Sequence, residues 1–136
     1  MKGVFMKLLK AFIAGSFFPF IASSLILWMA SVMDPTETQT VAAGHGIPYL
    51  WGAWNALYFL GFRHIIPGGE ALKAWIYGAL LGLVVACMAV LWLQLPEQMG
   101  WPPSMLYAPF VVAPLVYGIV WRYIVHPLNR LLRVNQ

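Results

Sequence analysis

The sequence is poor in charge and nearly free of cysteine. Only 9% of its 136 residues are charged, whereas soluble domains carry roughly 25%. Cys87 is the only cysteine, which excludes an internal disulfide and a dithiol redox relay within the chain. Hydrophobic residues make up 62% of the chain, more than a soluble domain of this size can hide from water. The composition therefore predicts an integral membrane protein.

Ionisable residues are also missing from the middles of the long apolar stretches. Proton-coupled transporters and ion pumps usually place a titratable residue inside the membrane, so this absence argues against both classes. We expect a protein that is not an enzyme, with no catalytic residues.

Four apolar stretches are predicted to cross the membrane as helices: approximately 10–33, 48–66, 71–95 and 104–125. Roughly 20 residues are needed to cross a hydrocarbon core of ~30 Å. The stretch 48–66 is the shortest and the most polar. The predicted fold is all-α, a four-transmembrane-helix bundle that forms a single integral membrane domain over residues 1–136.

The basic residues predict the orientation of this bundle. With four crossings, all eight lie on one side of the membrane: Lys2, Lys7, Lys10, Arg63, Lys73, Arg122, Arg130 and Arg133. Three acids, Asp34, Glu37 and Glu97, fall in the two loops on the other side. The positive-inside rule then places both termini in the cytoplasm, and we expect the inner membrane of a bacterium. The rule also accounts for the net charge of +4, so no nucleic-acid partner is expected.

The second and fourth stretches end in similar sequences. At one constant offset, three residues of the first segment match three of the second: Tyr58, Arg63 and Ile65 with Tyr117, Arg122 and Ile124. This similarity suggests two duplicated helical hairpins in parallel orientation. The alternative is coincidence, because helices that leave the membrane on the cytoplasmic side share aromatic, basic and aliphatic residues.

Small residues recur every fourth position in the third stretch, at Ala74, Gly78, Gly82 and Ala86. Such a face lets the backbone of another helix approach closely. We predict a helix-packing face, which either joins the helices of one bundle or forms a dimer interface.

Asn55 is the most polar residue within a predicted span. An amide in the membrane requires a partner on a neighbouring helix, so we predict that Asn55 contributes to helix packing. The alternative is that it lines a ligand path together with nearby tyrosines.

His64 and His126 are weak candidates for binding a cofactor. Each lies at the cytoplasmic end of a predicted span, and a pair of histidines can ligate haem iron. No cysteine or carboxylate lies near them in the sequence to complete a metal site. We therefore expect no cofactor and no metal.

Arg63, Lys73 and Arg122 are candidates for contacting lipid headgroups on the cytoplasmic side. The alternative is that they only set the topology, with their charged ends reaching the interface.

Three functional hypotheses follow from these features. The first is an accessory or assembly subunit in the lipid bilayer, which packs as a homo-oligomer or against a larger membrane-protein partner. The second is a small oligomeric carrier or channel for a small solute or lipid. The third is a haem- or quinone-linked redox subunit that uses His64 and His126.

Overall fold

The computed structural model describes residues 2–33, 46–98 and 100–134, which contain helices and turns but no strand. The predicted loop that carries Asp34 and Glu37 lies outside the described residues, except for Gly46 and Ile47. The chain folds as two compact units. Unit 1 comprises Met1–Ile65 and Pro127–Gln136, and unit 2 comprises Ile66–His126.

Unit 1 is built around a helical hairpin. Its elements are α1 (Lys2–Met33), α3 (Ile47–Leu57), the π-helical turn η3 (Tyr58–Phe62), α4 (Arg63–Ile65) and the larger part of α8 (His126–Leu131). α3, η3 and α4 follow one another without a break. Pro48 lies in the first turn of α3, where its missing N–H costs no helical hydrogen bond.

Glycines hold α1 and α3 close together. A Cβ atom added to Gly15 would come within 2.6 Å of the Trp51 carbonyl oxygen and 2.7 Å of the Asn55 Cβ. A Cβ at Gly52 would collide with Ser16 and Phe12. Larger side chains at either glycine would therefore force the helices apart.

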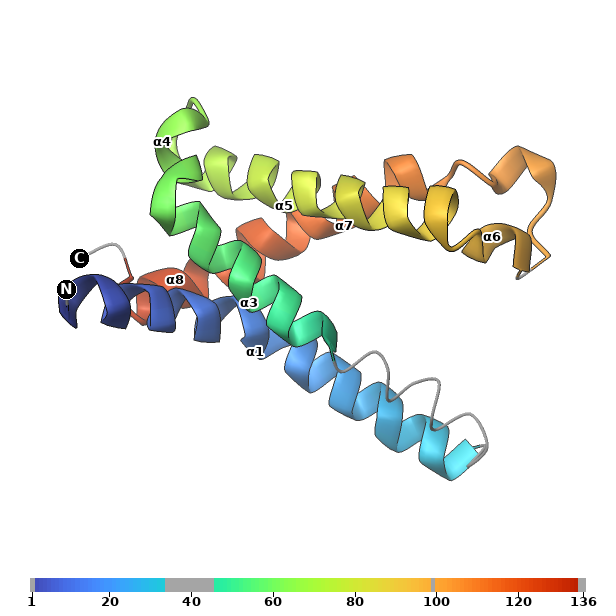
Figure 1. Cartoon of the computed structure of the whole chain (residues 1–136), viewed down its shortest axis with the longest axis horizontal. Coiled ribbons are helices and arrows are strands. Elements are labelled where there is room, and N and C mark those ends of the chain that lie inside the picture. The colour runs from blue at the N-terminus through green and yellow to red at the C-terminus, as the bar shows by residue number, and fades with distance from the viewer. Residues whose placement is uncertain (1, 34–45, 99, 135–136) are drawn as a thin grey trace. The chain divides into compact units, whose positions relative to one another are not determined.

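Unit 2 is a second hairpin, in which α5 and α7 lie side by side (Figure 1). Its elements are α5 (Glu70–Cys87), the π-helical turn η4 (Met88–Trp92), α6 (Leu95–Gln98), the 3-10 turn η5 (Pro103–Met105), α7 (Pro109–Val120) and the π-helical turn η6 (Trp121–Val125). Glu70 lies in the first turn of α5, where a carboxylate interacts favourably with the helix dipole.

The small-residue face of the third predicted span packs against α7 and η6. Ala74, Gly78, Gly82 and Ala86 are all buried. A Cβ at Gly78 would lie 2.6 Å from the Tyr117 carbonyl oxygen, and one at Gly82 would lie 2.5 Å from that of Ala113. The later glycine of α5 meets the earlier residue of α7, so the two helices are antiparallel. Within unit 2 this face is occupied by a helix of the same chain.

Three described helical segments are long and apolar enough to cross a membrane: Lys2–Met29, Glu70–Trp92 and Pro103–Leu131. They coincide with the first, third and fourth predicted spans. The second predicted span, 48–66, forms helix through residue 65 but is not among the three, since Asn55, Arg63 and His64 make it less apolar. The chain thus has the character of a multi-pass membrane protein with three clear spans. A membrane crossing by the second predicted span, 48–66, stays a prediction.

The π-helical turns bear on the suggested duplication. One begins at Tyr58 and another at Trp121. The sequence match pairs Tyr58 with Tyr117, one helical turn earlier than Trp121. The local backbone geometry therefore does not follow the offset of the sequence match, and the duplication stays a prediction.

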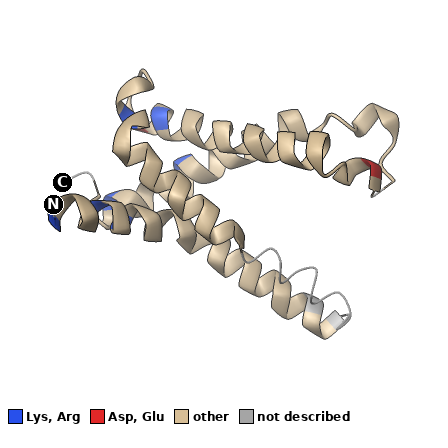
Figure 2. Cartoon of the chain, in the orientation of Figure 1, with Lys and Arg blue, Asp and Glu red and all other residues tan. Residues whose placement is uncertain are grey.

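Charge is distributed unevenly within each unit (Figure 2). In unit 2, Lys73 in the first turns of α5 and Arg122 after α7 lie at the same end of the antiparallel hairpin, while Glu97 lies at the opposite end. In unit 1, the start of α1, α4 and the C-terminal segment contain all the described charged side chains, and all of these are basic. This distribution is the one that the positive-inside rule requires.

Candidate functional site

Asn55 is the centre of a buried polar network in unit 1. Its side-chain amide donates to the carbonyl oxygen of Ala11 at 2.7 Å and to Oδ1 of Asn129 at 2.8 Å. Asn129 donates in return to Oδ1 of Asn55 at 3.1 Å. Both asparagines are almost fully buried, with 0% and 3% of their surface exposed. The network joins α1, α3 and α8.

Both amide protons of Asn55 are engaged, and its oxygen accepts a hydrogen bond. An asparagine amide has two protons to donate, so this side chain has no donor left for a ligand. The geometry suits a role in helix packing better than a role in lining a solute path. Asn129 was not singled out from the sequence, where it resembles an ordinary polar residue near the C-terminus.

The three basic residues that are candidates for contacting lipid headgroups are divided between the two units. Arg63 belongs to unit 1, and its guanidinium lies 6.0 Å from the centre of the Phe59 ring. In unit 2, Arg122 lies 5.3 Å from the centre of the Tyr123 ring, and Lys73 forms a 3.9 Å salt bridge with Glu70. The two arginines thus lie at distances at which a guanidinium is attracted to an aromatic ring, and contact with lipid headgroups stays a prediction.

The two candidate haem ligands also belong to different units, because His64 lies in α4 and His126 ends unit 2. No group of three or more His, Cys, Asp or Glu residues gathers into a metal site within the part of the chain that the structure describes. Ligation by the histidine pair stays a prediction.

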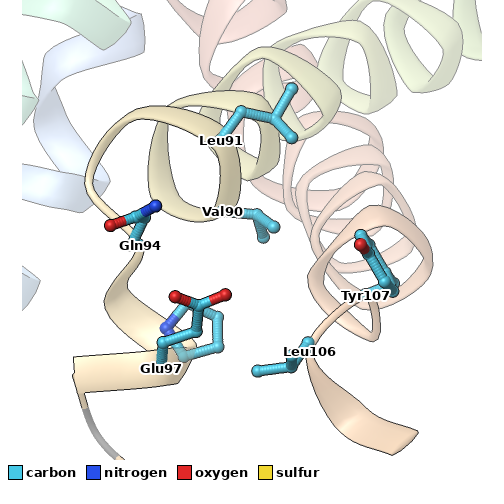
Figure 3. A pocket seen from close by; sticks show the side chains of 7 residues that line it. Val90, Leu91, Gln94, Glu97, Leu106 and Tyr107 are labelled. Atoms are coloured by element: carbon cyan, nitrogen blue, oxygen red, sulfur yellow. The ribbon is translucent and has the colours of Figure 1, made fainter. Parts of the chain in front are cut away.

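A pocket of about 190 Å³ lies at the end of unit 2 where the chain passes from η4 to α7 (Figure 3). Its lining comes from the end of η4 with α6 and from the turn before α7: Val90, Leu91, Gln94, Pro96, Glu97, Leu106 and Tyr107. The Glu97 carboxylate points into the space between Val90 and Leu106 (Figure 3). The pocket thus places one negative charge beside both polar and apolar side chains.

Local hydrogen bonds shape this pocket. Gln94 has a left-handed backbone with a φ of 49°, at the junction between η4 and α6. Its carbonyl oxygen accepts from the Gln98 N–H at 3.0 Å, and the Gln98 side chain donates to the Leu93 carbonyl oxygen at 2.8 Å. The Trp101 N–H donates to the Pro96 carbonyl oxygen at 2.9 Å. These bonds fix the backbone that carries Glu97.

The polar side chains of the pocket have no polar partner among the described residues. The Glu97 carboxylate, the Gln94 amide and the Tyr107 hydroxyl make neither a hydrogen bond nor a salt bridge to another described residue. The Tyr107 ring is stacked on Phe110, with 6.3 Å between the ring centres. Sequence reasoning treated Glu97 only as an indicator of topology, because its proximity to Tyr107 depends on the fold of the connecting turn.

No protein-family model, no curated protein and no solved structure matches this chain.

Proposed function

We propose that the chain is a non-catalytic, multi-pass inner-membrane protein that acts as an accessory or assembly subunit of a larger membrane-protein partner. The proposal includes a membrane crossing by the second predicted span, residues 48–66, and cytoplasmic termini. The observation that carries it is the exposed face of α1. In both hairpins the helix faces that carry the buried glycines already pack against a helix of the same chain. Association with a partner protein therefore requires a different surface.

The second half of α1 supplies such a surface. α1 continues beyond the first turn of α3 (Figure 1). Ser24 and Ser31 are exposed there and lie on one helical face, since seven residues make nearly two turns. The Ser31 hydroxyl donates to the Trp28 carbonyl oxygen at 2.7 Å, so its polarity is satisfied within the helix. Small residues on an outward face permit close helix packing, and lipid chains do not require them.

Large side chains share this face with the serines, because Trp28 lies four residues after Ser24 and three before Ser31, and Phe20 lies four residues before Ser24. Phe20, Leu25 and Trp28 expose 58%, 53% and 64% of their surface. Exposed aromatic side chains separated by small ones form a ridged surface, and the side chains of a partner helix can fit into the spaces at Ser24 and Ser31. The carrier hypothesis is less well supported, because Asn55 is buried and its amide protons are engaged within unit 1.

The test is purification of the tagged chain from its own membrane in mild detergent. Ser24→Leu combined with Ser31→Leu would block close approach to α1 while keeping the helix apolar. The matched control is Val112→Leu with Val116→Leu, which also adds bulk at two exposed positions on one face of α7. We expect the wild type and the control to retain a stoichiometric partner and the α1 variant to lose it. Retention by all three proteins would contradict the proposed surface.

A further inference from the structure

We propose that the Glu97 pocket binds the ammonium group of a small amine, either as the headgroup of an aminophospholipid or as a free organic amine. This inference concerns a surface of unit 2 and does not depend on the proposed partner of α1. It rests on the charge, the size and the lining of the pocket, and on its place at one end of the hairpin.

The charge of the pocket selects a cation. Glu97 is the only charged residue in the lining. Within unit 2, the described basic residues Lys73 and Arg122 lie at the other end of the hairpin. An anion would face the carboxylate with no basic side chain in the lining to balance it. A cation gains an electrostatic attraction that nothing in the lining offsets.

The composition of the lining favours an organic cation over a metal ion. Calcium takes six to eight oxygen ligands, and magnesium requires near-octahedral oxygen coordination. The pocket offers one carboxylate, and the other side-chain oxygens in its lining are those of Gln94 and Tyr107, which together are fewer than either metal requires. Val90, Leu91 and Leu106 suit the carbon atoms of an alkylammonium group. The Tyr107 ring adds an aromatic face of the kind that attracts such cations.

The size of the pocket limits the group that it can enclose, while the rest of a larger ligand would lie outside it. Sites for drug-sized molecules usually enclose roughly 300–1,000 Å³, whereas this pocket has a volume of about 190 Å³. A group the size of ethanolammonium or a methylated ammonium fits this limit. A polycyclic compound or a disaccharide exceeds it.

Neighbouring aromatic residues indicate that the pocket lies at headgroup depth. Trp92 ends η4 with 78% of its surface exposed, and Trp101 follows α6 with 39% exposed. Tryptophan is enriched at membrane–water interfaces. An ammonium group carried by a phospholipid would reach the pocket at this level, and a free amine would reach it from the water.

Binding is tested with the full-length protein, using native mass spectrometry from nanodiscs and titration in detergent. Nanodiscs of phosphatidylethanolamine are compared with nanodiscs of phosphatidylglycerol, and ethanolammonium chloride serves as the free amine. We expect saturable binding of at least one amine probe and no preference for phosphatidylglycerol. Retention of phosphatidylethanolamine without binding of free ethanolammonium would identify a site for a lipid headgroup. Binding of free ethanolammonium would identify a site for soluble amines.

Two pairs of variants locate the binding. Glu97→Gln removes the charge of the pocket, and Glu70→Gln makes the same change at the other end of unit 2. We expect Glu97→Gln to weaken amine binding about tenfold or more and Glu70→Gln to change it less than about twofold. Tyr107→Leu is paired with Tyr123→Leu, since the two tyrosines are similarly exposed, at 67% and 65%. Only Tyr107→Leu should weaken binding, by about threefold or more.

Three results would overturn the proposal. The first is a wild-type protein that binds neither amine probe in a saturable way. The second is equal affinity in Glu97→Gln and wild type, and the third is stronger retention of phosphatidylglycerol than of phosphatidylethanolamine. Thermal unfolding of each variant in detergent ensures that a loss of binding is not a loss of fold.

Discussion

Asn55 and Asn129 form a reciprocal pair of amide hydrogen bonds, although 74 positions separate them in the sequence. Both side chains are buried, and an amide deprived of its partner in such surroundings costs free energy. The pair therefore ties α8 to the hairpin of α1 and α3. This tie explains why the C-terminal segment belongs to unit 1 although unit 2 precedes it in the chain.

The asparagine pair predicts a strong energetic coupling. Asn55→Leu should lower the free energy of unfolding by about 1–3 kcal/mol, because it leaves the Asn129 amide and the Ala11 carbonyl without this partner. Asn129→Leu should have a smaller effect, since Asn55 keeps its bond to Ala11. The double variant should be less destabilised than the sum of the single variants by roughly 0.5–2 kcal/mol. Reversible unfolding in mixed micelles gives the free energy of unfolding of the wild type, the two single variants and the double variant. A double variant whose loss of stability equals the sum of the single losses would refute the coupling.

The close packing of Gly78 against Trp121 and Tyr117 predicts that a single added methyl group at this position lowers the stability of the chain. Gly78→Ala should destabilise the chain by about 1–3 kcal/mol, because the new Cβ meets Trp121 and the Tyr117 carbonyl oxygen. Gly61→Ala is the matched control, since a Cβ there has no neighbour within 4 Å. The control should be neutral or stabilise the helix by up to about 1 kcal/mol. Similar thermal denaturation of both variants would mean that the close approach of α5 and α7 is not needed.

The topology predicts which side of the membrane each end of the chain occupies. In a Cys87→Ser background, Gln98→Cys should react with an impermeant maleimide in intact cells. Lys2→Cys and Arg133→Cys should react only after permeabilisation, because four crossings place both termini inside. Labelling of one terminus from outside would mean that residues 48–66 do not cross the membrane, since three crossings put the termini on opposite sides.

The long spans could be predicted from composition alone. Segments 71–95 and 104–125 are apolar over most of their length, with Lys73 and Arg122 near their ends, and the structure has helix along most of each. Apolar length determines such elements because every backbone polar group in lipid must be satisfied within its own helix. The four-residue spacing from Ala74 to Ala86 also indicated a packing face, and in the structure these residues are buried.

The rest depends on contacts between distant residues. Asn129 has no local signal, because its role requires α8 to return to the hairpin of unit 1. The Glu97 pocket depends on the left-handed conformation at Gln94, a residue that the sequence does not mark as a turn former. Asn55 and Arg63 reduced the apolar character of the second span, so hydropathy alone is insufficient to establish its crossing.

Native mass spectrometry of the chain, released from its own membrane in mild detergent, tests the accessory role most directly. The account predicts a complex in which one larger membrane protein accompanies this chain in fixed stoichiometry, and in which Ser24→Leu with Ser31→Leu releases it. A monomer or a homo-oligomer as the only species, unchanged by these substitutions, would contradict the accessory role.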